Sequence, residues 1–300
     1  MRANRALKGL ALGGGLLVFI VLIAIVVEVL SGASMAFNKF GLGFIVHKTW
    51  IPAEDVFGGS TFIYGTLVTG FGSLILATIL GVSIGLFLAL MAPRRVAAVL
   101  GPLVEMLAAI PSVVVGLIGI YLICPFLKSD VEPWLHSAFG WIPIFGEPGT
   151  VGNSLFAAII VLTIMVVPII AALTRDLFLT VPGELRDGAE ALGATRWEMI
   201  RGVVMPTTRT GITAACVLGF GRAIGEAIAV AQVIGGVPAA PVNLFSAGYS
   251  QASVIANEFT GAVSQLHTSS LFYLAAILLV IGIVTNLLAQ RIARLGAPTI

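Results

Sequence analysis

Charged residues are scarce in this 300-residue chain. They make up 10% of it, whereas 58% of the residues are apolar and the mean hydropathy is +1.08. A soluble protein carries roughly 25% charged residues, so we exclude a water-soluble globule and expect lipid as the solvent. The net charge of +2 is too small to indicate nucleic-acid binding, and two cysteines are too few for a disulfide framework or a zinc site. We therefore expect no nucleic acid and no metal.

Uncharged runs long enough to cross a hydrocarbon core of about 30 Å recur six times along the chain. In lipid, a helix satisfies its own backbone hydrogen bonds, whereas a β-barrel would need short alternating strands. The predicted fold is therefore an all-α integral membrane protein with six transmembrane helices. We expect these helices near residues 9–27, within 56–93, and near 105–127, 150–173, 211–235 and 269–290.

The first predicted span follows three basic residues, as a signal peptide would. Its apolar run is longer than an h-region of about 7 to 15 residues, and no cleavage site is evident, so we interpret it as a retained anchor. We divide the chain into residues 1–60, an anchor helix with an outward loop, and residues 61–295, the transmembrane domain. One set of loops holds 12 Lys and Arg and the other holds 3, which predicts cytoplasmic termini and a cytoplasmic loop at 175–209.

This loop, residues 175–209, is the most polar part of the chain, with five arginines and five acids. Its apolar residues recur at helical spacing up to Gly193, which is placed to form a left-handed cap. Thr195 and Glu198 then form a capping-box sequence that opens a second short helix, and we expect Pro206 to end it. Two such amphipathic helices fit either the lipid headgroups or a groove on a soluble partner, and the pattern leaves both possibilities open.

Arg222 and Glu226 are the charges that lipid tolerates least. They lie about a dozen residues into the fifth predicted span, where each charge costs about 2.5 to 3.5 kcal/mol on insertion scales. Four residues apart on one helix face, they can form a structural salt bridge or line a polar path, and an arginine suits an oxyanion because its planar fork donates two hydrogen bonds. The surrounding Gly219, Gly221 and Gly225 suit close helix packing.

Other classes of protein have weaker support. Ser83 lies in a G-x-S-x-G string typical of hydrolases, but it falls within a span and the three histidines fall in loops, so we favour helix packing. A passive anion channel is a further alternative. Pro111 is expected to kink the third span. No G-x-x-x-x-G-K-[ST] sequence is present, so we expect another polypeptide to bind ATP.

Several stretches resemble one family. Asp187-Gly188-Ala189, Gly193 and Pro206 have the spacing of the coupling loop of bacterial ABC importer permeases, although Asp187 and Gly188 replace the usual Glu and Ala. Further similarity lies in residues 50–67, 107–116, 191–200, 219–226 and 255–267. By these stretches the chain resembles the PstC-type phosphate permeases, a group of binding-protein-dependent transport system inner membrane components.

The resemblance implies a MetI-like fold and a permease subunit of an ATP-driven phosphate importer, with sulfate or molybdate as the alternative cargo. It implies that the chain is not itself an enzyme and binds no cofactor, because ATP and Mg²⁺ belong to a separate subunit. The expected partners are a PstA-type sister permease in a heterodimer, two ATP-binding subunits and an external phosphate-binding protein, in the bacterial inner membrane.

The resemblance implies that the loop that carries Ala189 and Trp197 docks on the ATP-binding subunit, and that Gly221 and Gly225 pack against the second permease. Our hypothesis for the charged pair is that Arg222 meets phosphate during passage while Glu226 balances its charge, with a structural salt bridge as the alternative.

Overall fold

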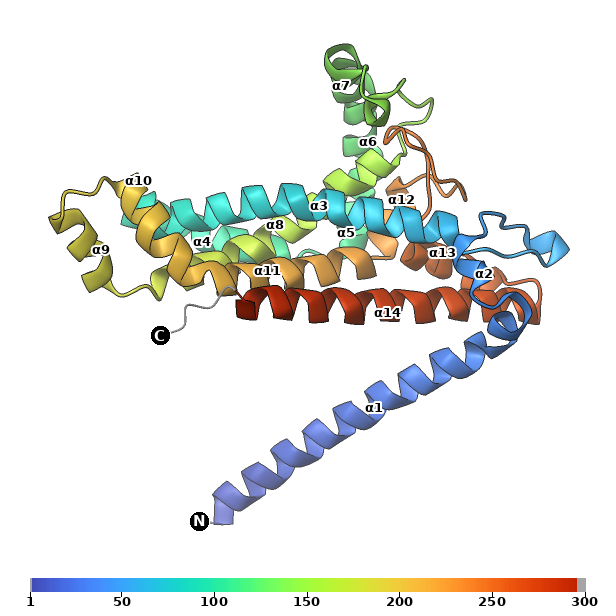
Figure 1. Cartoon of the computed structure of the whole chain (residues 1–300), viewed down its shortest axis with the longest axis horizontal. Coiled ribbons are helices and arrows are strands. Elements are labelled where there is room, and N and C mark those ends of the chain that lie inside the picture. The colour runs from blue at the N-terminus through green and yellow to red at the C-terminus, as the bar shows by residue number, and fades with distance from the viewer. Residues whose placement is uncertain (1, 296–300) are drawn as a thin grey trace.

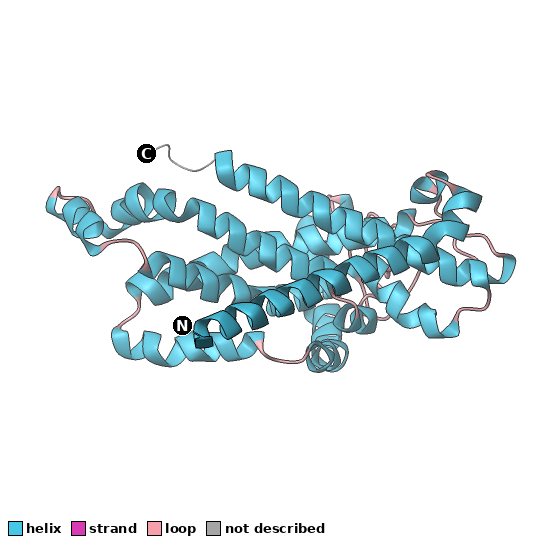
Figure 2. Cartoon of the chain, turned by 90° about the horizontal axis from the view of Figure 1, so that it is seen from below, coloured by secondary structure: helices cyan, strands magenta, loops and turns pink. Residues whose placement is uncertain are grey.

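The computed structural model describes residues 2–295, and helices joined by short loops make up nearly all of this part of the chain (Figure 2). Between residues 2 and 295 the only β pairing consists of two isolated bridges, Ile51 with Val56 and Gly235 with Gly248. Six helical segments are long and apolar enough to cross a membrane: Leu10–Phe40, Ser60–Met91, Ser112–Phe139, Leu155–Leu179, Arg196–Gly225 and Gln265–Leu288. The predicted all-α class with six spans is confirmed.

Five long helices form the frame of the molecule (Figure 1). They are α1 (Arg2–Phe40), α3 (Ser60–Leu86), α8 (Leu155–Leu179), α11 (Met205–Gly225) and α14 (Gln265–Leu295). The shorter α-helices are α2 (Gly43–Val46), α4 (Arg94–Ala108), α5 (Ser112–Ile118), α6 (Cys124–Phe126), α7 (Glu132–Phe139), α9 (Gly183–Ala191), α10 (Arg196–Met199), α12 (Ile228–Val233) and α13 (Gln251–Glu258). Wider π turns are η2 (Phe87–Met91), η3 (Gly119–Ile123), η4 (Leu127–Val131) and η6 (Ile200–Val204), and 3-10 turns are η1 (Pro52–Glu54), η5 (Pro143–Phe145) and η7 (Phe259–Gly261).

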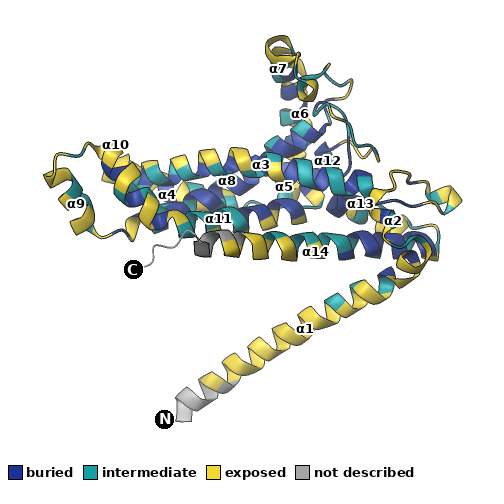
Figure 3. Ribbon diagram, in the orientation of Figure 1, coloured by how far each residue is buried: buried dark blue, intermediate teal, exposed yellow. Residues whose placement is uncertain are grey.

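Helix α8 is the centre of the bundle, and most of its residues are buried (Figure 3). Helix α3 packs along it through glycines: a Cβ added at Gly81 would lie 2.8 Å from Ile170 Cβ, and one at Gly85 would overlap the Thr174 hydroxyl. Between these glycines, the Ser83 hydroxyl donates to the carbonyl of Ile79 at 2.7 Å, within its own helix. The G-x-S-x-G string is therefore a packing surface, as predicted.

Helix α1 extends well beyond the predicted span 9–27, because it continues through Glu28 to Phe40. Its second half packs against α14, where the Ser269 hydroxyl donates to the carbonyl of Gly32 at 2.6 Å. Its first half diverges from the bundle and exposes its apolar side chains (Figures 1 and 3). Burial against α14, which lies more than 200 residues away in sequence, therefore extends this helix past the charge that was expected to end it.

Two other predicted spans are placed wrongly. The third was expected at 105–127, but α4 ends at Ala108 and a new helical segment begins at Ser112, so Pro111 breaks the helix rather than kinking it. The fifth was expected at 211–235, but it runs from Arg196 to Gly225. The loop predicted at 175–209 is correspondingly shorter, since α8 extends to Leu179 and a helix resumes at Arg196.

The bundle has two chemically different ends. We call the end that carries α9 and α10 the arginine-rich end, and the opposite end, which carries α2 and α13, the loop-rich end (Figure 1). At the loop-rich end, a partly buried group of side chains links distant segments: Glu258 Oε2 accepts from Trp50 Nε1 at 2.9 Å and lies 3.0 Å from His267 Nε2. The His267 ring stacks on Phe57. This contact fixes the turn at 47–58 against the start of α14.

Candidate functional sites

Arg222 occupies the last turn of α11 and faces two cavities. One cavity places it beside Ile164 and Met165, near the middle of the 25-residue helix α8. Its side chain is exposed in the isolated chain, and among the described side chains no carboxylate lies within the 4.0 Å ion-pair distance of its guanidinium. A permanently charged fork with unused donors, set midway along the bundle, can bind an oxyanion.

Glu226 does not share a helix face with Arg222, contrary to the prediction. Helix α11 ends at Gly225, and the backbone of Glu226 is extended, with φ −73° and ψ 119°. The Glu226 carboxylate instead accepts a hydrogen bond from the backbone N–H of Ala229 at 3.3 Å, at the start of α12. Glu226 therefore holds the break between α11 and α12, and its charge stands beyond the helix end rather than against the guanidinium.

The three glycines near Arg222 have different surroundings. A Cβ at Gly219 would lie 2.8 Å from Val166 Cγ1, so this glycine packs against α8 within the chain. A Cβ at Gly221 or Gly225 would meet no atom within 4 Å. The sequence predicted packing at all three positions, and the structure brings only Gly219 against another helix of this chain.

The segment between α8 and α11 forms a polar surface at the arginine-rich end, which we call the α9–α10 surface (residues 183–199). Gly193 has a φ of +87°, which confirms the predicted left-handed cap. The capping box is also confirmed, because the Thr195 backbone N–H donates to Glu198 Oε2 at 2.8 Å and the Glu198 N–H donates to Thr195 Oγ1 at 3.3 Å. Such local bonds keep a short helix formed where few side chains are buried.

Most of the predicted docking residues on this surface are solvent-exposed. Asp187, Gly188 and Trp197 are exposed, as is Leu192. Ala189 is half-buried and packs on a cluster that includes Phe178, Met199 and Ile200. One side of the α9–α10 surface therefore packs on the bundle, and the other side is exposed.

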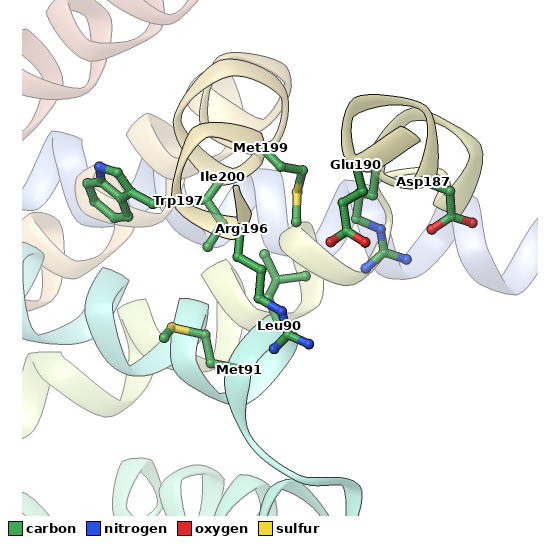
Figure 4. Close-up of a pocket in the computed structure, with 9 residues that line it drawn as sticks. Leu90, Met91, Asp187, Glu190, Arg196, Trp197, Met199 and Ile200 are labelled. Atoms are coloured by element: carbon green, nitrogen blue, oxygen red, sulfur yellow. The ribbon is translucent and has the colours of Figure 1, made fainter. Parts of the chain in front are cut away.

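An open groove of about 510 Å³ lies between this surface and η2, the turn that follows α3 (Figure 4). Figure 4 shows Asp187 and Glu190 on α9 at one side and Arg196 reaching down from α10 toward Leu90, while Trp197 projects from the far side of α10. Its floor and walls also include Leu90, Met91, Arg186, Met199 and Ile200. Two arginines and two acids balance each other, and apolar side chains lie between them, so the groove suits a mixed protein surface better than a free ion.

Pro206 does not end the second short helix, contrary to the prediction. The chain continues as one helical segment from Arg196 to Gly225, and a π turn at Ile200–Val204 precedes the proline. In that turn the Met205 N–H donates to the carbonyl of Ile200, five residues earlier. Because proline lacks an N–H and its ring crowds the carbonyl four residues before it, a locally widened turn lets the helix pass through.

Sequence reasoning missed several residues near these sites. Thr285 and Asn286 of α14 line the larger cavity at Arg222, and their only sequence signal was polarity within an apolar span. Arg175 also lies inside the bundle end, where its guanidinium contacts Glu105 at 2.9 Å. This ion pair joins α4 to α8 and could not be read from residues 70 positions apart.

Among the side chains that the structure describes, no group of three or more His, Cys, Asp or Glu is arranged to hold a metal ion.

Comparisons with known proteins agree with this architecture. The family described as "Binding-protein-dependent transport system inner membrane component" matches residues 81–295. The phosphate transport system permease protein PstC of Mesorhizobium japonicum is 38% identical, over 94% of this chain and 89% of that protein. The PstC of Pasteurella multocida is 40% identical, over 92% and 88%, and a probable PstC of Methanocaldococcus jannaschii is 32% identical, over 90% and 87%.

The fold is also similar to a solved structure. A chain of the MetNI methionine ABC transporter in an inward-facing conformation superposes with a TM-score of 0.56 at 18% identity, covering 78% of this chain and 94% of that one. The resemblance to PstC-type permeases and the MetI-like fold are therefore confirmed.

Proposed function

The chain belongs to the family of binding-protein-dependent transport system inner membrane components, and from this premise we propose that it is a permease subunit that carries inorganic phosphate in an ATP-driven importer. Its relatives at 32 to 40% identity bear the name of phosphate transport permeases. The observation that carries the proposal is Arg222, whose guanidinium has no ion pair among the described side chains and lies in the last turn of α11, beside the middle of α8. A charge in that position is tolerated where it lines a polar path.

Arg222 is the proposed contact for phosphate during passage. Its fork donates two parallel hydrogen bonds to an oxyanion and remains charged at any physiological pH. Glu226 supplies negative charge just past the end of α11, which keeps anion binding weak enough for release. Thr285 and Asn286 add hydroxyl and amide groups to the same cavity.

The arginine-rich end faces the cytoplasm in this proposal, as does each terminus, because basic residues concentrate in cytoplasmic loops. There the α9–α10 surface docks on ATP-binding subunits, two per complex, which hydrolyse ATP with Mg²⁺. A PstA-type sister permease completes the path across the open face at Gly221 and Gly225. An external phosphate-binding protein delivers its cargo to the loop-rich end.

Sulfate and molybdate are the alternative cargoes, since a guanidinium fork accepts any tetrahedral oxyanion. A passive anion channel would instead conduct without ATP. An intramembrane hydrolase lacks support, because the Ser83 hydroxyl is bonded within its own helix.

The test uses the assembled complex in liposomes and follows uptake of radiolabelled phosphate with ATP, with sulfate and molybdate as competitors. Arg222→Gln should lose phosphate uptake by about 100-fold, the upper range for a lost charge-assisted contact, and retain basal ATP hydrolysis. Arg222→Lys, which keeps the charge but not the fork, should fall between the two. Arg209→Gln is the matched control, because Arg209 is an exposed arginine near the other end of the same helix.

Normal uptake by Arg222→Gln would remove this residue from the pathway. Uptake by the unaltered complex without ATP would favour the channel, and import of sulfate or molybdate in preference to phosphate would reassign the cargo.

A further inference from the structure

Helices α1 and α14 cross near the loop-rich end and diverge toward the other end of the bundle (Figures 1 and 2). At the crossing, the Ser269 hydroxyl donates to the carbonyl of Gly32 at 2.6 Å and accepts from the backbone N–H of Ala36 at 2.9 Å. A Cβ at Gly32 would lie 2.6 Å from Cγ of Phe272, so this glycine lets the helices approach closely. The crossing is therefore fixed, and the angle between the two helices stays open.

This angle holds an open cavity of about 550 Å³, which we call the α1–α14 cavity. Most of its lining is apolar, including Leu30, Phe37, Leu42, Ile277, Val280 and Ile281. The hydroxyls of Ser34 and Tyr273, which also line it, already donate to backbone carbonyls at 2.7 and 3.1 Å. The cavity therefore presents hydrocarbon to the molecule that fills it.

The depth of the α1–α14 cavity is close to that of one membrane leaflet. Along α1 its lining runs from Asn38 at the loop-rich end to Leu30. Along α14 it runs in the same direction, from Tyr273 to Ile281. Each wall rises over about eight residues, or about 12 Å, and half of a hydrocarbon core measures about 15 Å. Both walls belong to helical segments that are long and apolar enough to cross a membrane.

Polar groups stand at one end of this cavity. Asn38 and Lys39 are exposed at its loop-rich end. The Lys39 ammonium donates to the carbonyl of Asp55 at 3.4 Å, and among the described side chains no carboxylate lies within the 4.0 Å ion-pair distance of it. The deeper end is bounded by Leu30, Val280 and Ile281. A ligand with an anionic head and a hydrocarbon tail complements this arrangement.

The exposure of α1 favours lipid over a protein surface as the neighbour at this cavity. From residue 16 to residue 23, every side chain of α1 is apolar and between 48% and 65% exposed. A helix that is apolar on all sides is typical of a membrane span, whereas a helix that packs on one partner has a selected face. No such face distinguishes this half of α1.

We propose that the α1–α14 cavity binds one anionic phospholipid of the leaflet at the loop-rich end. An acyl chain lies between Leu30 and Val280, and the headgroup phosphate meets Asn38 and Lys39. The lipid fills space that the fixed crossing leaves open, and so supports the angle at which α1 leaves the bundle. This inference goes beyond the proposed function, because it depends on the membrane setting of two helices and not on the cargo.

The first test measures lipid retention. The assembled complex is purified in a mild detergent, phosphatidylglycerol is added, and bound lipid is followed by native mass spectrometry. Val280→Phe places a ring in the cavity from a side chain that is 55% exposed, so the chain is expected to fold. Displacing two methylene groups of the acyl chain should weaken binding by about tenfold. Ile283→Phe is the control, because Ile283 is 51% exposed on the same helix but does not line the cavity.

The headgroup contact has its own variant. Lys39→Gln should weaken binding of phosphatidylglycerol by about fivefold, the effect of one lysine at an anionic lipid, and should affect zwitterionic phosphatidylethanolamine less. Lys128→Gln is the matched control. Lys128 is also exposed and also donates to a backbone carbonyl, that of Thr150, but lies outside the cavity.

A second test identifies the occupant directly. A diazirine amino acid in place of Leu30 has about the size of leucine and reacts on illumination with the molecule beside it. In the complex within membranes, it should acquire the mass of a phospholipid. A product with the sister permease would instead show that protein covers the cavity, and a product with α14 would show that the cavity closes on itself.

The outcomes keep the lipid site and the proposed function apart. The site is overturned if the unaltered complex retains no phospholipid, if each substitution acts no more strongly than its control, or if the diazirine captures protein. Should Val280→Phe fail to assemble, Lys39→Gln and the diazirine still decide the matter. Failure of the unaltered complex to import phosphate would contradict the proposed function while leaving lipid retention unaffected.

Discussion

Three glycines of α11 provide matched substitutions with opposite expected effects. A Cβ at Gly219 would lie 2.8 Å from Val166 Cγ1 and 3.2 Å from two atoms of Ile170, whereas a Cβ at Gly221 or Gly225 would have open space. Gly219 therefore contributes to the stability of this chain. Gly221 and Gly225 leave a smooth stretch of helix that suits close approach of a second chain.

The magnitudes follow from this geometry. Gly219→Ala adds a carbon below van der Waals distance, and overpacking of that kind costs about 1 to 3 kcal/mol. Alanine regains about 1 kcal/mol of helix propensity, so the net loss of unfolding free energy is about 0 to 2 kcal/mol. At Gly221 and Gly225 an added Cβ meets no atom within 4 Å, so Gly221→Leu and Gly225→Leu should leave the isolated chain about as stable, while their side chains block pairing.

Two assays distinguish these effects. Unfolding of the purified chain in mixed detergent micelles, followed by the fluorescence of its four tryptophans, measures stability. Co-purification with the second permease measures pairing. If Gly221→Leu and Gly225→Leu destabilise the isolated chain as much as Gly219→Ala does, the packing argument is wrong. If both co-purify and transport normally, this face does not contact the partner.

Three further substitutions test other parts of the molecule. Pro206→Ala restores a backbone donor, lets the π turn at Ile200–Val204 rewind and rotates α11 against the α9–α10 surface, so phosphate imported per ATP hydrolysed should fall. Glu258→Gln weakens the charge-assisted bonds from Trp50 and His267 and should lower the free energy of unfolding by about 1 to 3 kcal/mol, measured in the same detergent assay. Gly193→Ala forces a side chain onto a φ of +87° and should cost about 1 to 2 kcal/mol in that assay.

Each substitution has a matched control in the chain. Thr207→Ser changes the residue after Pro206 without adding a backbone donor and keeps the hydroxyl that donates to the Val203 carbonyl, so it should leave coupling intact. Glu54→Gln alters an exposed carboxylate of the same loop-rich end, and Gly188→Ala adds a Cβ with no atom within 4 Å. Equal effects in a substitution and its control would contradict the corresponding argument.

Short-range patterns predicted much of the α9–α10 surface correctly. The cap at Gly193 and the box formed by Thr195 and Glu198 depend on residues within one or two turns of each other, and both are present. Local sequence gave a wrong prediction at Pro206, because the rule that proline ends a helix describes an isolated helix. Burial of Met199 and Ile200 against α8 accompanies a helix that passes through with a widened turn.

The surroundings of Arg222 were likewise predicted only in part. Its position a dozen residues into a span at 211–235 was predicted wrongly, because the helical segment ends at Gly225; Arg222 nevertheless lies beside Ile164 and Met165 near the middle of α8. The position of Glu226 relative to Arg222 could not be predicted. Helical spacing assumes that the helix continues, whereas α11 ends at Gly225. The apolar side chains of α4 and α5 that line the smaller cavity at Arg222 could not be predicted either, because they lie more than 100 positions away in sequence.

The amino-acid sequence alone established the lipid environment, the six spans, the polar segment between the fourth and fifth, and the arginine that lipid disfavours. These follow from the transfer cost of charge and from hydrogen bonding within a single turn, which act on each residue and its near neighbours. Helix ends, the break at 109–111 and the unequal cavities on either side of Arg222 arose only from the packed fold. They depend on contacts between helices far apart in the chain, where burial outweighs local preference.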